Sequence, residues 1–233
     1  MSEAGEILEI LRSIELPLER RRSVRASEKH QKRGFVLGYT ICYSQGWTCS
    51  TATRKHPLLA FLLCQYIRRR LPNFVFTSIM VNQGRSALHV DMSNCDLSAI
   101  FSLGDHTGGE LWQYPNTVLR IHGKLRQCHG SLPHITLPFE GERYSFVYYN
   151  LAAKVAKEPS PETTAVLDAL GFWRPDDRPT RTLPARQDLL ADAARILRKE
   201  YGLSSKFIGD YANKTIPSET EKRRQTRKAS GHR

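Results

Sequence analysis

Two residues that could bind a metal ion, His89 and Asp91, lie two positions apart in the stretch Ala-Leu-His-Val-Asp at residues 87–91. In an extended strand this spacing places both side chains on the same face. An imidazole and a carboxylate on one face can form a structural hydrogen bond, or they can supply two of the ligands of a metal ion. The metal interpretation requires a third ligand further along the chain.

The later histidines are His106, His122, His129 and His134. His106 lies in the turn-like sequence Gly-Asp-His-Thr-Gly-Gly and is expected to be exposed, and His122 is expected on the half-buried surface of a strand. His129 and His134 both precede a strongly β-forming stretch. His134 is the preferred third ligand because it comes directly before the strand that carries Arg143, and His129 stays open as the alternative.

Arg143 and Ser145 follow in Arg-Tyr-Ser, and on a strand their side chains point the same way. A guanidinium and a hydroxyl on one face can hold a carboxylate. A buried arginine in an apolar strand otherwise needs another fixed anion. A surface ion pair of Arg143 with Glu140 or Glu142 is the alternative, but the adjacent Phe-Val-Tyr-Tyr stretch favours burial.

Two histidines and one carboxylate on one face of an octahedral metal leave three positions open, which is the facial arrangement of non-haem Fe(II) oxygenases. The order His-x-Asp, distant His, then Arg-x-Ser resembles the Fe(II)/2-oxoglutarate-dependent dioxygenases over roughly residues 34–152. The spacing from His134 to Arg143 is one residue shorter than is usual in that family, a difference that a strand bulge could absorb.

The resemblance implies an α+β fold with a double-stranded β-helix (jelly-roll) core and flanking helices. It implies that His89, Asp91 and His134 bind Fe(II), and that Arg143 and Ser145 hold the distal carboxylate of 2-oxoglutarate. The implied reaction oxidises or hydroxylates a C–H bond with O₂ while 2-oxoglutarate becomes succinate, with ascorbate as a candidate reductant.

Two further contacts are expected near this site, and two other functions remain open. Asn82 would add a polar contact to the co-substrate, and residues 108–112 would form a hairpin with Trp112 at the mouth of the site. Zinc on the same ligands would serve hydrolysis or structure, but it leaves Arg143 and Ser145 unexplained. A cupin-like module that only binds a ligand is the third reading.

The hydrophobic periodicity predicts helices and short strands in a definite order. Helices are expected at 5–14, 56–70, 161–173 and 185–202, and strands within 34–47 and at 74–82, 86–91, 97–104, 109–114, 117–123 and 143–151. We divide the chain into an N-terminal helix and basic arm (1–33), the dioxygenase core (34–152), a helical extension (153–205) and a basic, disordered tail (206–233). Helical support is expected on one side of the β core.

The net charge of +12 lies mainly in two arms. Residues 20–33 hold seven Lys/Arg and one Glu, and residues 221–233 hold six Lys/Arg and one Glu. Such arms suit nucleic acid, an acidic macromolecule or nuclear import, or they are only solvated tails. The first substrate hypothesis is therefore a methyl group on a nucleobase, and the alternative is a protein hydroxylated as prolyl hydroxylases do.

The five cysteines are odd in number and show no Cys-x-x-Cys spacing, which favours reduced thiols and an intracellular location in the nucleus or cytoplasm. No stretch of the sequence approaches the roughly 18 apolar residues of a membrane span, so no membrane partner is expected.

Overall fold

The computed structural model describes residues 2–18, 32–42, 44–151, 157–175 and 184–209. Of the two basic arms, only Lys32 and Arg33 fall within these ranges. Among the described residues, no helix combines the length and the apolar character that crossing a bilayer requires.

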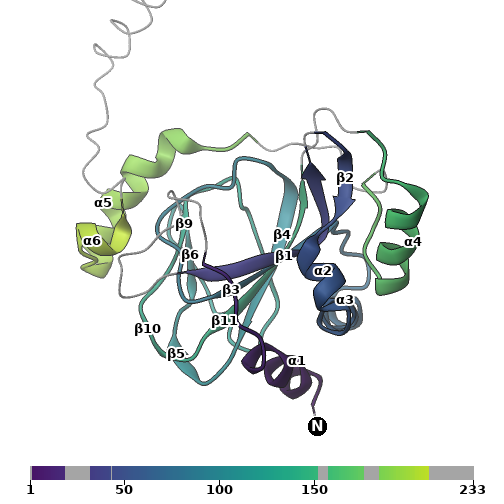
Figure 1. The fold of residues 1–233 in the computed structure, drawn as a ribbon. Helices are drawn as coiled ribbons and strands as arrows, with labels where there is room; N and C mark the ends of the chain where they lie inside the picture. The colour runs from purple at the N-terminus through teal and green to yellow at the C-terminus, as the bar shows by residue number, and fades with distance from the viewer. Residues whose placement is uncertain (1, 19–31, 43, 152–156, 176–183, 210–233) are drawn as a thin grey trace, which may run out of the picture.

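The largest element is a six-stranded sheet in which every neighbouring pair of strands is antiparallel. Its order is β2-β1-β3-β11-β4-β8. The strands are β1 (Arg33–Cys42), β2 (Gly46–Cys49), β3 (Ser78–Gln83), β4 (Asn94–Leu103), β8 (Arg126–Cys128) and β11 (Tyr144–Leu151). Figure 1 shows β1, β3, β4 and β11 side by side through the middle of the molecule.

Two smaller sheets complete the β structure. One has the order β7-β6-β9, and the other pairs β10 with β5. Their strands are β5 (His106–Gly108), β6 (Leu111–Gln113), β7 (Thr117–Leu119), β9 (His134–Thr136) and β10 (Phe139–Gly141).

The prediction of a regular strand at 86–91 is wrong. The segment makes only one isolated bridge, between His89 and His134. Its other backbone groups bond elsewhere. The amide of Leu88 donates to the carbonyl of Ile208, and the amide of Asp91 donates to the carbonyl of Gly130. The segment is nevertheless held at three points, each by a different part of the chain.

Strict alternation along β11 gives the large sheet two chemically different faces. Phe146 and Tyr148 point to one side and are fully buried in the main apolar core. Ser145 and Val147 point to the other side and line a cavity. A side-chain period of two residues therefore separates the core that stabilises the sheet from the surface that can do chemistry.

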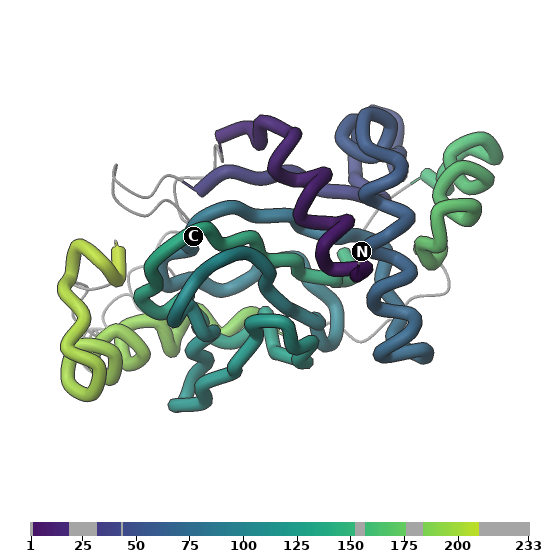
Figure 2. Tube along the Cα trace, turned by 90° about the horizontal axis from the view of Figure 1, so that it is seen from below, coloured from purple at the N-terminus to yellow at the C-terminus, as the bar shows by residue number. Residues whose placement is uncertain are grey.

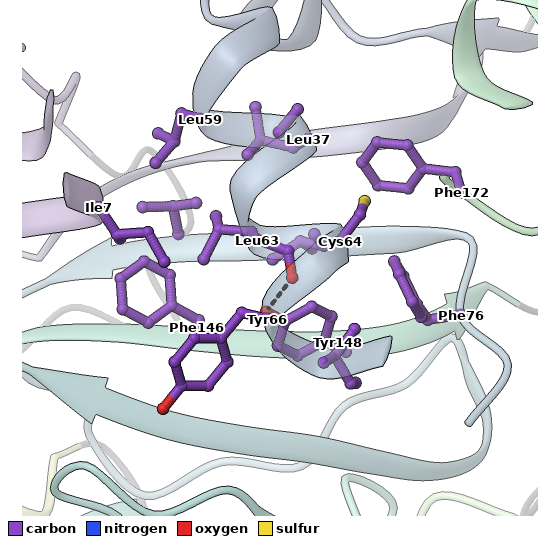
Figure 3. Close-up of a cluster of buried hydrophobic side chains, with 14 of the residues drawn as sticks. Ile7, Leu37, Leu59, Leu63, Cys64, Tyr66, Phe76, Phe146, Tyr148 and Phe172 are labelled. Atoms are coloured by element: carbon purple, nitrogen blue, oxygen red, sulfur yellow. Dashed lines mark hydrogen bonds between the residues drawn. The ribbon is translucent and has the colours of Figure 1, made fainter. Parts of the chain in front are cut away.

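Helices cover the apolar face of the large sheet. α3 (Pro57–Arg70) begins and ends where the sequence predicts, and α1 (Glu3–Arg12) and α2 (Thr51–Lys55) pack beside it. Figure 3 shows Leu59, Leu63 and Cys64 of α3 directed at the sheet. The hydroxyl of Tyr148 donates to the carbonyl of Leu63 at 2.8 Å, so the polar tip of a fully buried ring is satisfied (Figure 3).

The C-terminal helix α4 (Pro161–Leu170) joins this group by packing on α3, whereas α5 (Leu190–Tyr201) lies apart from it. α4 and α5 occupy opposite ends of the molecule, as both views show (Figures 1 and 2). α5, preceded by the 3₁₀ turn Gln187–Leu189 and followed by α6 (Ser205–Ile208), packs against Trp112 and Ile135 of the small sheet. Helical support is thus on both sides of the β core, not on one side as predicted.

The buried face of α3 generates a test of the core. Leu63→Ala removes a fully buried side chain and should lower the free energy of unfolding by about 2–5 kcal/mol. Leu58→Ala, in the same helix at a position 60% exposed, is the matched control and should change it by less than about 0.5 kcal/mol. Urea denaturation followed by circular dichroism measures both, and equal losses would contradict the assigned packing of α3.

Candidate metal centre

His89, Asp91 and His134 form the one group of three potential metal ligands among the described residues. Their ligand atoms all lie within 4.8 Å of one another. The Asp91 carboxylate is 3.8 Å from Nε2 of His89 and 4.0 Å from Nε2 of His134. An ion that bonds nitrogen and oxygen at about 2.0–2.2 Å holds ligands on one face about 3 Å apart, so shifts of about 1 Å or less in each side chain would bring the three onto a single metal ion.

Both imidazoles are oriented by the same kind of contact, a hydrogen bond to the backbone carbonyl two residues earlier. Nδ1 of His89 lies 2.7 Å from the carbonyl oxygen of Ala87, and Nδ1 of His134 lies 2.8 Å from that of Leu132. A carbonyl only accepts, so each Nδ1 carries the proton and each Nε2 presents its lone pair. The two rings lie 4.2 Å apart between centroids, with both Nε2 atoms turned toward Asp91.

The carboxylate of Asp91 is positioned from a different direction. Its Oδ2 accepts a hydrogen bond of 2.9 Å from the side-chain amide of Asn94. A Cβ on Gly130 would lie only 2.8 Å from the same oxygen, so the absence of a side chain there makes room for the carboxylate. The sequence analysis missed both Asn94 and Gly130. Asn94 is visible in the sequence only as an amide three residues after the aspartate.

A cavity of about 420 Å³ opens beside these ligands, within the size range of small-molecule sites. Its walls come from the inward faces of the two larger sheets: Met80 and Asn82 of β3, Ser98 and Ile100 of β4, Leu111 of β6, Thr136 of β9, and Ser145, Val147 and Tyr149 of β11. Cys128 also lines it, and burial raises the pKa of this thiol to about 12, so Cys128 is protonated at neutral pH.

Beyond Ser145, the next position on the same face of the chain is Arg143, which is 2% exposed. Its Nη1 donates to the carbonyl of Gly84 at 3.1 Å, while its Nε is buried without a hydrogen-bond partner among the described residues. Burial lowers the pKa of Arg143 to about 10, which still leaves it charged at neutral pH. Within that part of the chain Arg143 makes no ion pair, although the nearby charge of Glu110 favours its protonated form.

Asn82 supports the same end of the cavity. It is 5% exposed, and its side-chain oxygen has no hydrogen-bond partner among the described residues. It lies directly opposite Ser145 in the strand register, so the two side chains share the inward face. Lys32, also buried and lining the cavity, was assigned by the sequence to a basic arm; only its alternation with Gly34 on β1 could have indicated an inward position.

Three sequence predictions around the site are corrected. His106 is buried, not exposed, because it packs under the exposed ring of His122 at 4.0 Å between centroids. Trp112 does not line the mouth. It is fully buried against α5, and its neighbour Leu111 faces the cavity instead. The hairpin lies between β6 and β7 and turns at residues 114–116, so it is not centred on 108–112.

The structure distinguishes between the two candidates for the third ligand. His134 belongs to the three-residue group, whereas His129 is exposed and its backbone amide donates to the side chain of Gln113. The chain thus resembles the Fe(II)/2-oxoglutarate-dependent oxygenases in the grouping of its ligands as well as in their order.

No protein-family model and no curated protein matches the sequence. Among solved structures, an oxidoreductase of the 2OG-Fe(II) oxygenase family from Burkholderia pseudomallei aligns with 66% of this chain and 81% of its own, at 17% identity and a TM-score of 0.43. YcfD, a ribosomal oxygenase from Escherichia coli solved with cobalt and succinic acid, aligns with 84% of this chain at 14% identity and a TM-score of 0.32, and the chain spans 49% of its length. OsALKBH1 aligns with 71% of this chain and 86% of its own, at 13% identity and a TM-score of 0.26.

The geometry of the ligands predicts which histidine a metal needs. His134→Ala should weaken Co(II) binding by at least about 100-fold, because changes even to outer-shell partners of a metal ligand cost about 10–100-fold. His129→Ala is the matched control and should bind Co(II) as the unchanged protein does. Visible absorption titration measures both, and a loss on His129→Ala with retention on His134→Ala would reverse the ligand assignment.

The buried His106 predicts a specific pH dependence of stability. Burial, followed by the charges of His122 and Arg143, lowers the pKa of His106 from 6.5 to about 4. Between these two values the unfolded chain binds a proton that the folded chain does not, so the free energy of unfolding falls as the pH drops through this window. His106→Gln should flatten the acid side of the stability profile, measured by urea denaturation from pH 7 to pH 4.

His129→Gln serves as the control in that experiment, because this exposed imidazole should leave the slope unchanged. An unaltered slope in His106→Gln would show that other groups cause the acid sensitivity.

Proposed function

We propose that this chain is an oxidoreductase, an Fe(II)- and 2-oxoglutarate-dependent dioxygenase that oxidises or hydroxylates a C–H bond. The observation that carries the proposal is the combination of a His-Asp-His group beside the cavity with a buried arginine, Arg143, two residues before the cavity-lining Ser145. A metal ion alone would explain the His-Asp-His group. It would not explain Arg143, a charged side chain that is 2% exposed and lacks an ion pair among the described residues.

The strand order supports a jelly-roll core for this enzyme. One layer would consist of β3-β11-β4-β8. The other would consist of the segment around His89 followed by β9, β6 and β7. From β3 to β11 the chain alternates between these two layers except at the β6–β7 hairpin, which lies entirely in the second layer; this order supports a double-stranded β-helix. Within the proposed division of the chain, residues 34–152 form this catalytic core, and 1–33 and 153–205 flank it. The basic tail proposed for 206–233 starts later than that division has it, because residues 206–208 belong to α6 and Ile208 is fully buried.

The roles of the side chains follow from their positions. His89, Asp91 and His134 would hold Fe(II), with the Nδ1–H groups of both histidines fixed by backbone carbonyls. Arg143 and Ser145 would receive the distal carboxylate of 2-oxoglutarate. When bound, Fe(II) with 2-oxoglutarate and O₂ supplies the oxidant for the C–H bond and yields succinate and CO₂; ascorbate would keep the metal reduced.

The apolar middle of the cavity has its own role in this proposal. Val147 and Ile100 lie opposite one another in the strand register, and both line the cavity that also contains the candidate metal ligands. Such side chains exclude water around the co-substrate and strengthen the electrostatic contacts at both of its ends.

The substrate we propose is a macromolecule, with a methyl group on a nucleobase as the first candidate, because the net charge of +12 favours a polyanion. A protein hydroxylated at a side chain is the alternative. All five cysteines are free thiols, which supports a reducing compartment, the nucleus or the cytoplasm.

The deciding experiment is an anaerobic titration of the purified protein with Fe(II) and 2-oxoglutarate, followed in the visible spectrum. A weak charge-transfer band should require both components and disappear in His134→Ala. Arg143→Ala should leave Fe(II) binding intact but raise the concentration of 2-oxoglutarate needed for the band by about 10–100-fold, since charged hydrogen bonds contribute about 1.5–3 kcal/mol. Asp91→Ala should abolish succinate formation while the circular dichroism spectrum stays unchanged.

Arg143→Lys separates charge from geometry in the same titration. A lysine keeps the positive charge but cannot make two parallel hydrogen bonds, so it should recover only part of the affinity for 2-oxoglutarate. Absence of the band together with tight Zn(II) binding would overturn the proposal in favour of a hydrolytic or structural zinc site.

A further inference from the structure

Beside the cavity, the chain from Leu111 to Phe139 contains no aspartate or glutamate. Its three cations are Arg120, Lys124 and Arg126, which we call the basic edge. All three side chains are exposed. Among the described residues none of the three forms an ion pair, so these charges are not used to stabilise the fold.

The backbone that carries the basic edge is firmly attached to β4. The amide of Ser102 donates to the carbonyl of Ile121 at 2.8 Å, and the amide of Gly123 donates back to the carbonyl of Ser102 at 2.9 Å. Ile121 itself is 1% exposed. Arg120 and Lys124 therefore flank a turn whose position is fixed by the large sheet.

Strand register places Arg126 on the cavity side of the sheet. On β8 Arg126 lies directly opposite Ile100, and Cys128 lies opposite Ser98. Directly opposed residues share a face, and Ile100, Ser98 and Cys128 all line the cavity. Arg126 thus emerges from the inward face at the outermost strand, one strand away from the cavity wall.

The same strand leads straight to the metal centre. Two residues after Cys128, Gly130 accepts a hydrogen bond from the amide of Asp91 and packs against its carboxylate. A chain bound along the basic edge would therefore pass beside the proposed reacting atoms. Tyr149 lines the cavity and is half-buried. The face of its ring is a surface on which a planar base can stack.

We infer that the basic edge binds the phosphodiester backbone of a nucleic acid strand and presents one of its bases to the cavity. This inference rests on the proposed function, because it names the substrate class for that site. It adds docking contacts on the folded core to the charge that the two terminal arms carry. Unpaired cations on a fixed backbone, with no carboxylate in 29 residues from Leu111 to Phe139, favour repeated phosphates as the occupant.

The test measures binding of a fluorescein-labelled oligothymidylate by anisotropy at several salt concentrations, with the full chain and without iron. Lys124→Gln/Arg126→Gln removes two charges of the basic edge. Its slope of log K against log salt should become shallower by about 1.4, the value for two phosphate contacts on a single strand. Arg54→Gln/Lys55→Gln is the charge-matched control on α2, which packs on β1 at the opposite side of the large sheet, and should leave the slope unchanged.

Equal changes in the two double variants, or no change in either, would overturn the inference. An equal loss of binding to a polyglutamate peptide would also overturn it, since the edge would then recognise acidic protein. Neither result depends on iron or 2-oxoglutarate, so the visible band described above still decides the proposed enzyme class separately. If the charge-transfer band appears but the oligonucleotide does not bind, the dioxygenase proposal stands and nucleic acid is rejected as its substrate class.

Discussion

The reciprocal pair of backbone hydrogen bonds between His89 and His134 is the contact on which the metal centre depends. The amide of His89 donates to the carbonyl of His134 at 3.1 Å, and the amide of His134 donates back at 2.9 Å. These bonds fix two residues 45 positions apart as direct neighbours. Because each ring also takes its orientation from the carbonyl two residues earlier in its own segment, the backbone alone determines where both lone pairs point.

A second constraint is the burial of the charged Arg143, two residues before the cavity-lining Ser145. Arg143 is almost completely removed from water, and Gly109 makes this possible, because a Cβ there would lie 2.7 Å from Nε of the guanidinium. The carbonyl of Gly84 satisfies one donor group but supplies no charge. Among the described residues no carboxylate forms an ion pair with this buried cation, so an anionic ligand would offset the cost of its burial.

The sequence predicted the grouping of His89, Asp91 and His134 better than the surroundings of the site, and the reason is physical. His89 and Asp91 share a face in any extended backbone, so their grouping did not depend on whether residues 86–91 formed a regular strand. The elements with strong periodicity, such as α3, were likewise predictable. Trp112 was misplaced because alternation fixes that neighbours point to opposite faces but does not say which face is the cavity.

His106 illustrates what local sequence cannot convey. Its glycine-rich surroundings are typical of an exposed turn, yet the ring is covered by His122, which lies 16 residues later and is brought there by the bond from Gly123 to Ser102. Arg143 was expected to be buried from the apolar strand that follows it, and it is. Gly130 was missed because it meets Asp91 only in the folded chain, and Lys32 because a basic stretch of sequence does not reveal burial beside a cavity. Asn94 lies three residues from Asp91, but no sequence pattern marks its amide as the partner of that carboxylate.

The attachment of the C-terminal helices to the metal-bearing segment affects when the centre can form during synthesis. Leu88, next to His89, bonds to Ile208, and Phe207 covers the buried guanidinium of Arg85 with its ring 3.7 Å away. A nascent chain that has already exposed every proposed ligand, through His134, still lacks this backing. Because domains fold as their segments emerge from the ribosome, the backing that α6 gives to the segment of His89 and Asp91 is complete only after residue 208 has been synthesised.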